Sequence, residues 1–241
     1  MGKKHLSVLM LYVRSSIIPL LGMLVLIGSI QTGLFLWRMN RGANSLEAVI
    51  QSAHLRAVLM SGFLLLAAFL YRINGGGYTL RRLRISERAI FLWQSLSYFL
   101  CFALLWMAEV IIITLLCQYY LTQPVVNIVS NQTLFLAFYR SDFLHSILPL
   151  EEISRWIYLL ITFGTLSFTT AGATVRKRYG RNIRNNVPLS LTVASMLFYF
   201  VRPLGSLASD VILSLLHTAL ILYTLWDVWF NAEEVISDEN N

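Results

Sequence analysis

Charged side chains are scarce in this chain, at 13% of its 241 residues, whereas a soluble domain carries about 25%. Hydrophobic residues make up 57% of the sequence, and the mean hydropathy is +0.65. This composition excludes an ordinary soluble domain and indicates a chain embedded mostly in lipid. The net charge of +7 would suggest nucleic acid as a partner of a soluble protein, but membrane proteins collect Lys and Arg in their cytoplasmic loops. We therefore predict an integral membrane protein with no nucleic-acid partner.

The sequence also lacks the common signatures of cofactor and metal chemistry. Its two cysteines, Cys101 and Cys117, lie in one apolar run, where a helix would hold them about 24 Å apart, too far for a disulfide. No CxxC spacing occurs, and His217, alone in an apolar segment, cannot complete a zinc site, which needs several protein ligands. No GxxxxGK[ST] pattern occurs, so the chain does not hold ATP by that route. We expect no cofactor, no metal and no catalytic residue.

Long apolar runs dominate the sequence. A bilayer core about 30 Å thick needs about 20 apolar residues per helix, and six stretches qualify. These are 15–37, 57–73, 89–121, 156–175, 188–208 and 211–230. The sequence therefore predicts an all-α fold, with one transmembrane domain over residues 1–241 and six spanning helices. The fourth stretch is rich in glycine, alanine, serine and threonine, which lets helices approach closely.

Two of these stretches have more than one interpretation. The stretch 89–121 would form a helix of roughly 50 Å, so either its first turns lie along the inner membrane surface or the helix is strongly tilted. The stretch 188–208 is interrupted by Arg202, Pro203 and Gly205. Either Arg202 reaches the outer headgroups, or the chain breaks there and re-enters the membrane.

The distribution of basic residues predicts the orientation. With the N-terminus inside, thirteen of the nineteen Lys and Arg residues fall in inner segments, so both termini are expected in the cytoplasm, in a multi-pass protein of the cell membrane. Before the first span, residues 3–14 place Leu6, Leu9, Met10 and Val13 along one helical face. This pattern favours a helix lying along the inner membrane surface, with a frayed terminus as the alternative.

Glu109 is the one acidic residue well inside a predicted span. A carboxyl group is costly in lipid, so we expect it to face the protein interior, where it is neutral or has a partner. One hypothesis places it along a transport path or in a coupling element. The other gives it a structural hydrogen bond to a neighbouring helix.

The segment 151-EEISR-155 resembles the paired glutamates and arginine of intramembrane CAAX-type proteases. Here one residue too few separates the glutamates from Arg155, and no FxxxH follows. An acidic helix start at the outer surface explains the segment more simply, so the protease remains the lesser alternative.

The loop between the second and third stretches concentrates basic and apolar side chains. The candidate residues are Leu80, Arg81, Arg82, Leu83, Arg84, Ile85 and Arg88. Lipid phosphates would account for the arginines alone. The interleaved apolar residues, with Ser86 as a helix N-cap and Glu87 in the first turn, favour a short amphipathic element that docks into another protein.

With this loop, the six spans and the amphipathic segment 3–14, the chain resembles the permease subunits of bacterial ATP-binding-cassette (ABC) transporters of the type-2 exporter class. The resemblance implies that the loop is a cytoplasmic coupling helix contacting a separate ATPase subunit. It also implies a second copy or a sister permease as partner, with membrane lipids around both. The expected function is export of a substrate using ATP hydrolysed by the partner. A non-transporting membrane sensor or immunity subunit is the alternative.

Overall fold

The computed structural model describes residues 2–41, 46–50, 53–73, 86–122, 136, 139–149, 152–178, 186–201 and 207–238. Every element in these ranges is helical, and no strand occurs within them, so the predicted all-α fold is confirmed. The helices are α1 (Gly2–Asn40), α2 (Leu46–Ile50), α3 (Ala53–Ile73), α5 (Glu87–Leu121), α7 (Asp142–Ile147), α8 (Ile153–Arg178), α9 (Val187–Val201) and α10 (Leu207–Asp238).

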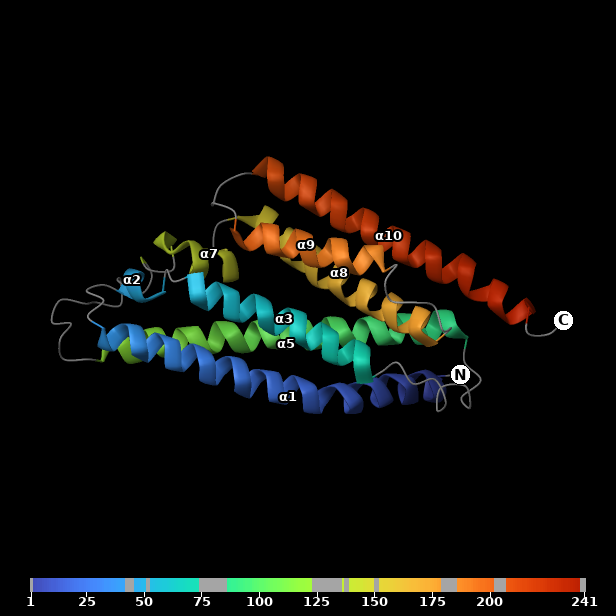
Figure 1. Ribbon diagram of the computed structural model, residues 1–241, viewed down its shortest axis with the longest axis horizontal. Helices are drawn as coiled ribbons and strands as arrows, with labels where there is room; N and C mark the ends of the chain where they lie inside the picture. The colour runs from blue at the N-terminus through green and yellow to red at the C-terminus, as the bar shows by residue number, and fades with distance from the viewer. Residues whose placement is uncertain are drawn as a thin grey trace.

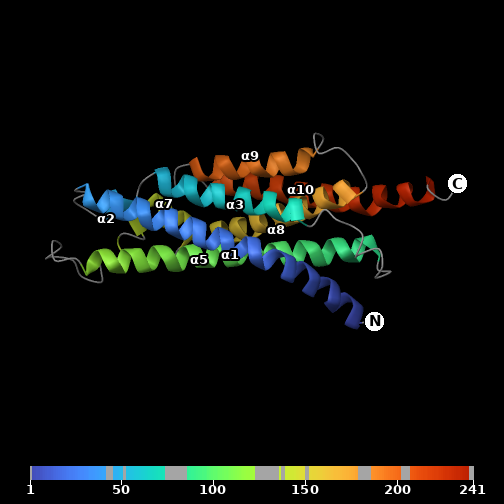
Figure 2. The same cartoon turned by 60° about the horizontal axis from the view of Figure 1, so that its bottom comes forward.

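The six longer helices lie side by side in an elongated bundle and alternate in direction along the chain (Figure 1). Both chain termini lie at one end of this bundle, which we call the termini end. The short helices α2 and α7 lie at the opposite end, which we call the far end (Figures 1 and 2). An even number of antiparallel passes therefore returns the chain to the side on which it began.

Five of the helices are long and apolar enough to cross a membrane. They contain the apolar segments Ser7–Asn40, Leu55–Ile73, Glu87–Leu121, Ile153–Arg178 and Leu207–Phe230. The predicted stretches 15–37, 57–73, 89–121, 156–175 and 211–230 lie within these five segments. The chain is thus a polytopic helical membrane protein.

Helix α9 covers the first part of the predicted fifth span. The stretch 188–208 is longer than the helix, which ends at Val201 after 15 residues, and α10 begins at Leu207. A 15-residue helix is about 22 Å long, shorter than the roughly 30 Å hydrocarbon core. Residues 202–206, and with them the choice between a snorkelling Arg202 and a re-entrant break, lie outside the described residues.

The predicted interfacial helix 3–14 is not a separate element. It forms the first turns of the continuous helix α1, which also contains Pro19, and Figure 2 shows these turns diverging from the bundle. Val8 and Tyr12 are nonetheless buried in a small cluster with Ile90 of α5. The N-terminal segment is therefore anchored by side chains to the start of α5.

Helix α5 is straight and continuous in both views (Figures 1 and 2). Its 35 residues span about 52 Å. No separate surface helix precedes it within the described residues 86–122.

The core of the bundle is filled around α8. Its small residues are buried, as predicted, and at Gly172 an added Cβ would lie only 2.5 Å from Thr224 Cγ2 of α10. Aromatic rings fill the space between α3, α5 and α8. In this aromatic layer Phe63 stacks on Phe163 with centroids 5.5 Å apart, and Trp106 meets Phe163 at 6.3 Å. The centre of the single chain is thus packed.

The far end of the bundle is closed by α7 (Figure 1). Phe143, Leu144 and Ile147 are almost fully buried against the main core. Trp106 Nε1 donates a hydrogen bond to the Ile147 carbonyl oxygen at 3.0 Å. These apolar side chains therefore face the bundle rather than the surroundings.

Candidate functional site

The start of α5 is the part of the predicted coupling region that the structure describes. Leu80, Arg81, Arg82, Leu83, Arg84 and Ile85 lie outside the described residues. Ser86 occupies the N-cap with extended dihedral angles, and its carbonyl oxygen accepts a hydrogen bond from Ile90 N at 3.1 Å. Its side chain makes no capping hydrogen bond, while Glu87 occupies the first turn. The predicted helix start is confirmed, but through the backbone rather than the serine hydroxyl.

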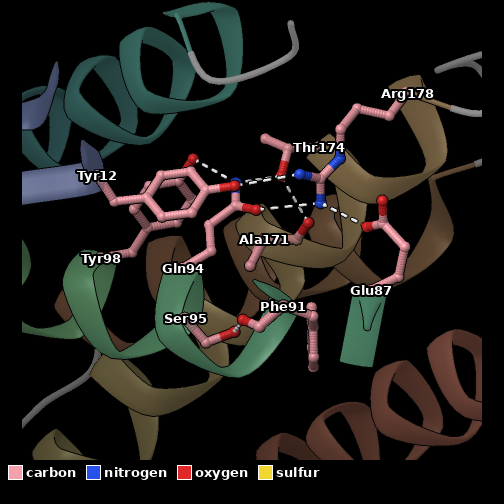
Figure 3. Close-up of polar contacts among 9 residues, drawn as sticks. All are labelled: Tyr12, Glu87, Phe91, Gln94, Ser95, Tyr98, Ala171, Thr174 and Arg178. Atoms are coloured by element: carbon pink, nitrogen blue, oxygen red, sulfur yellow. Dashed lines mark hydrogen bonds and ion pairs between the residues drawn. The ribbon is translucent and has the colours of Figure 1, made fainter. Parts of the chain in front are cut away.

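Glu87 and Gln94 on α5 both contact Arg178, the last residue of α8 (Figure 3). Arg178 Nη2 lies 3.4 Å from Glu87 Oε2 and donates to Gln94 Oε1 at 3.3 Å. Arg178 Nη1 donates to the Tyr12 hydroxyl on α1 at 3.1 Å. Only 5% of the Arg178 side chain is exposed, so its charge is held by these partners rather than by bulk water. One guanidinium thereby connects three helices.

Gln94 extends the same set of contacts to a fourth helix. Its Nε2 donates to the Thr174 hydroxyl on α8 and to the Tyr98 hydroxyl at 2.7 Å. Tyr98 in turn donates to the Leu70 carbonyl oxygen on α3 at 3.2 Å. We call the following set the termini-end network: Tyr12, Glu87, Gln94, Tyr98, Thr174 and Arg178 (Figure 3). It links α1, α3, α5 and α8 where the loop 74–85 enters α5.

Arg88, a predicted coupling residue, contacts α10 within the same chain. Its Nη2 donates to the Trp229 carbonyl oxygen at 3.1 Å, and its guanidinium lies 5.6 Å from the Trp229 ring centroid. Nearby, Arg176 Nη2 and Nε each lie 2.8 Å from Asp227 Oδ2, joining α8 to α10. The first two residues of α5 thus contact Arg178 at the end of α8 and Trp229 of α10.

This arrangement is suited to transmitting a displacement. Glu87 and Arg88 follow the loop directly, and their partners belong to helices that run the length of the bundle. Sequence reasoning identified Arg88 but missed Gln94 and Arg178. Gln94 carried a usable signal, because it is an uncharged polar residue in the same apolar run as Glu109. Arg178 had no such signal in the sequence, because it lies in a run of basic residues that is typical of any inner loop.

Glu109 is buried between α5 and α1, at 1% exposure, and accepts a hydrogen bond from Gln31 Nε2. It lies about 22 Å along α5 from Gln94, so it is not part of the termini-end network. Its side chain faces protein, as predicted, and the hydrogen bond agrees with the structural hypothesis. A role in a transport path or in coupling stays a prediction.

His217 is the centre of a second buried polar cluster, which joins α8, α9 and α10. Its Nε2 lies 2.7 Å from Ser195 Oγ, and its Nδ1 lies 3.4 Å from Thr162 Oγ1. The hydroxyls of Thr162 and Ser195 donate to the carbonyl oxygens of Tyr158 and Thr192, each at 2.8 Å, so both can serve as acceptors for an imidazole N–H. A serine activated by histidine shares this pattern, but Ser195 and His217 are 6% and 0% exposed. The cluster is sealed within the protein and acts as a contact between helices.

The remaining acidic candidates form ion pairs at the far end. Glu152 pairs with Arg155, whose Nε also lies 3.9 Å from Asp210 Oδ2, while Glu151 lies outside the described residues. Within the described parts of the chain, no group of three or more His, Cys, Asp or Glu side chains is placed to hold a metal ion. Comparison with protein-family models, curated proteins and solved structures gives no match.

Proposed function

We propose that this chain is the permease subunit of a bacterial ATP-binding-cassette exporter, driven by an ATPase subunit that docks on the loop 74–85. The proposal rests on the contacts that the first residues of α5 make with other helices. Glu87 contacts Arg178 of α8 and Arg88 contacts Trp229 of α10, so a movement of the loop reaches three helices at once. Arg178 passes the contact on to Tyr12 of α1.

The charges at the termini end support a cytoplasmic location for this docking surface, in the cell membrane. Basic side chains gather here at the ends of α3 and α8, in the positions expected of the inner leaflet. They include Arg72, Arg176, Lys177 and Arg178. An ATPase needs access to cytoplasmic ATP, so the predicted coupling loop lies on the side where such a partner works.

The packed centre of the bundle supports a path formed between two chains. The aromatic layer around Phe163 fills the space among α3, α5 and α8. A substrate path through one copy would require this layer to separate. A path between this chain and a second copy, or a sister permease, leaves it intact.

The test is purification of the tagged chain from its native membranes in mild detergent, with identification of co-purifying ATPases and measurement of ATP hydrolysis. We expect an ABC ATPase subunit to co-purify with the wild-type chain. Leu83→Asp should abolish co-purification, because an unpaired carboxylate is strongly unfavourable in an apolar docking groove. Ser237→Asp, a charge added near the C-terminus at the same end of the bundle, serves as the matched control and should leave it intact.

The outcomes separate the alternatives. An ATPase that co-purifies equally with Leu83→Asp would reduce the loop to a lipid anchor. Absence of any ATPase from the wild-type preparation would refute the proposal. An ATPase whose hydrolysis never depends on a transported substrate would favour the sensor or immunity subunit.

A further inference from the structure

The acidic side chains that the structure describes fall into two kinds. Four of them lie against an arginine. These pairs are Glu87 with Arg178, Glu152 and Asp210 with Arg155, and Asp227 with Arg176. Glu109 differs from all four, because its hydrogen-bond partner is the uncharged carboxamide of Gln31.

Among the residues that the structure describes, no basic side chain contacts Glu109. Nearby on the seam between α1 and α5, an added Cβ at Gly28 would lie 3.3 Å from Ile112 Cδ1, and Phe35 meets Tyr120 edge to face at 6.5 Å. Neither α1 from residue 27 to 36 nor α5 from 105 to 113 carries another ionisable side chain.

The pair of Glu109 and Gln31 lacks one hydrogen-bond donor. Gln31 is 0% exposed and its Oε1 has no hydrogen-bond donor, although Gln31 Nε2 donates to Glu109 Oε1. If Glu109 were ionised, the pair would present a buried anion and an unsatisfied carbonyl oxygen to an apolar seam. Each of these is costly in a low-dielectric interior. One proton on the carboxyl group would remove the charge and supply the missing donor to Gln31 Oε1.

We propose that Glu109 and Gln31 form a proton-binding site inside the membrane, in which Glu109 is held as the neutral carboxylic acid. The acid donates to Gln31 Oε1 and accepts from Gln31 Nε2, so the two side chains close a reciprocal ring between α1 and α5. Removing the proton leaves an anion without a cation in the seam. Proton release is therefore linked to separation of α1 from α5 or to entry of water. This inference is independent of the ATP-driven function proposed above.

Infrared spectroscopy of the full-length chain, in a detergent free of ester groups and at neutral pH, tests the proposal directly. A protonated carboxyl group has a carbonyl stretching band separate from that of a carboxylate, and this band shifts in heavy water. We expect such a band in the wild-type chain and its loss in Glu109→Gln, which preserves the size of the side chain. In Gln31→Leu the band should persist but move to higher frequency, because its hydrogen bonds are gone. Asp227→Asn, which alters an arginine-paired acid, is the control and should leave the band unchanged.

A second measurement does not depend on the folding of any variant. A lipid-soluble carbodiimide adds to a neutral carboxylic acid to give an O-acylisourea, which rearranges to a stable N-acylurea. Mass spectrometry of peptides from the labelled wild-type chain should locate this product at Glu109 and not at the arginine-paired acids. A wild-type spectrum without the band would overturn the proposal, as would a band that persists in folded Glu109→Gln.

Discussion

Replacing Arg178 by methionine tests how strongly the termini-end network holds the bundle together. The substitution keeps a long side chain but removes donors to Tyr12 and Gln94 and the charge beside Glu87. Each charge-assisted hydrogen bond contributes roughly 1.5 kcal/mol, and stranding the buried Gln94 oxygen costs about 1 kcal/mol more. The Glu87 pair adds about 0.5 kcal/mol at most, because its distance is 3.4 Å and 26% of that side chain is exposed. Since coupled contacts do not add fully, we expect a loss of about 3 kcal/mol in the free energy of unfolding.

The assay is unfolding in mixed micelles with increasing denaturing detergent, followed by far-ultraviolet circular dichroism. Lys177→Met is the matched control at the neighbouring position, because Lys177 makes only an exposed 3.4 Å contact to the Arg72 carbonyl oxygen and a ring contact with Tyr71. Arg178→Lys should fall between wild type and Arg178→Met, because an ammonium keeps the charge but cannot span the same three partners. A loss below about 1 kcal/mol in Arg178→Met, with normal helix content, would refute the view that this network joins the helices.

Three further results are expected. Gly172→Ala should lower stability by about 1–3 kcal/mol through the clash with Thr224 Cγ2, and adding Thr224→Ala should restore most of the loss in the same unfolding assay. A cysteine at the exposed Tyr139 should react with an impermeant thiol reagent in intact cells while one at Ser237 does not, and the reverse pattern would invert the proposed orientation. A fluorophosphonate should not label Ser195, because the hydroxyl is sealed among α8, α9 and α10, and labelling would support the enzyme alternative.

Secondary structure and the positions of the five long spans were predictable because they depend on local properties. A run of apolar side chains in lipid must form a helix to satisfy its own backbone, so the five long segments follow from hydropathy. The small residues of α8 likewise predicted close contacts between helices, and Gly172 makes such a contact with Thr224. For the predicted fifth span the structure describes α9, which has 15 residues and ends at Val201.

The partners of the polar residues could not be predicted in this way. Burial of Glu109 followed from the cost of a carboxyl group in lipid, but Gln31 is 78 positions away and nothing local links the two. The same holds for Arg178, which is 166 residues from Tyr12 and 84 from Gln94. Hydrogen-bond partners across a bundle depend on which helices are neighbours and on their rotation and depth, and helix packing decides these.

By itself, the sequence determined that this chain spans a membrane as antiparallel helices. The reason is that the free-energy cost of exposing backbone polar groups and charges to lipid applies to each residue locally. It also determined which end carries the positive charge. Only the tertiary structure decided that the amphipathic N-terminal segment joins the first span, that α9 is short, and that Glu87 and Arg88 contact α8 and α10. These features arise from the packing of side chains between helices, where a contact exists only once both surfaces are brought together.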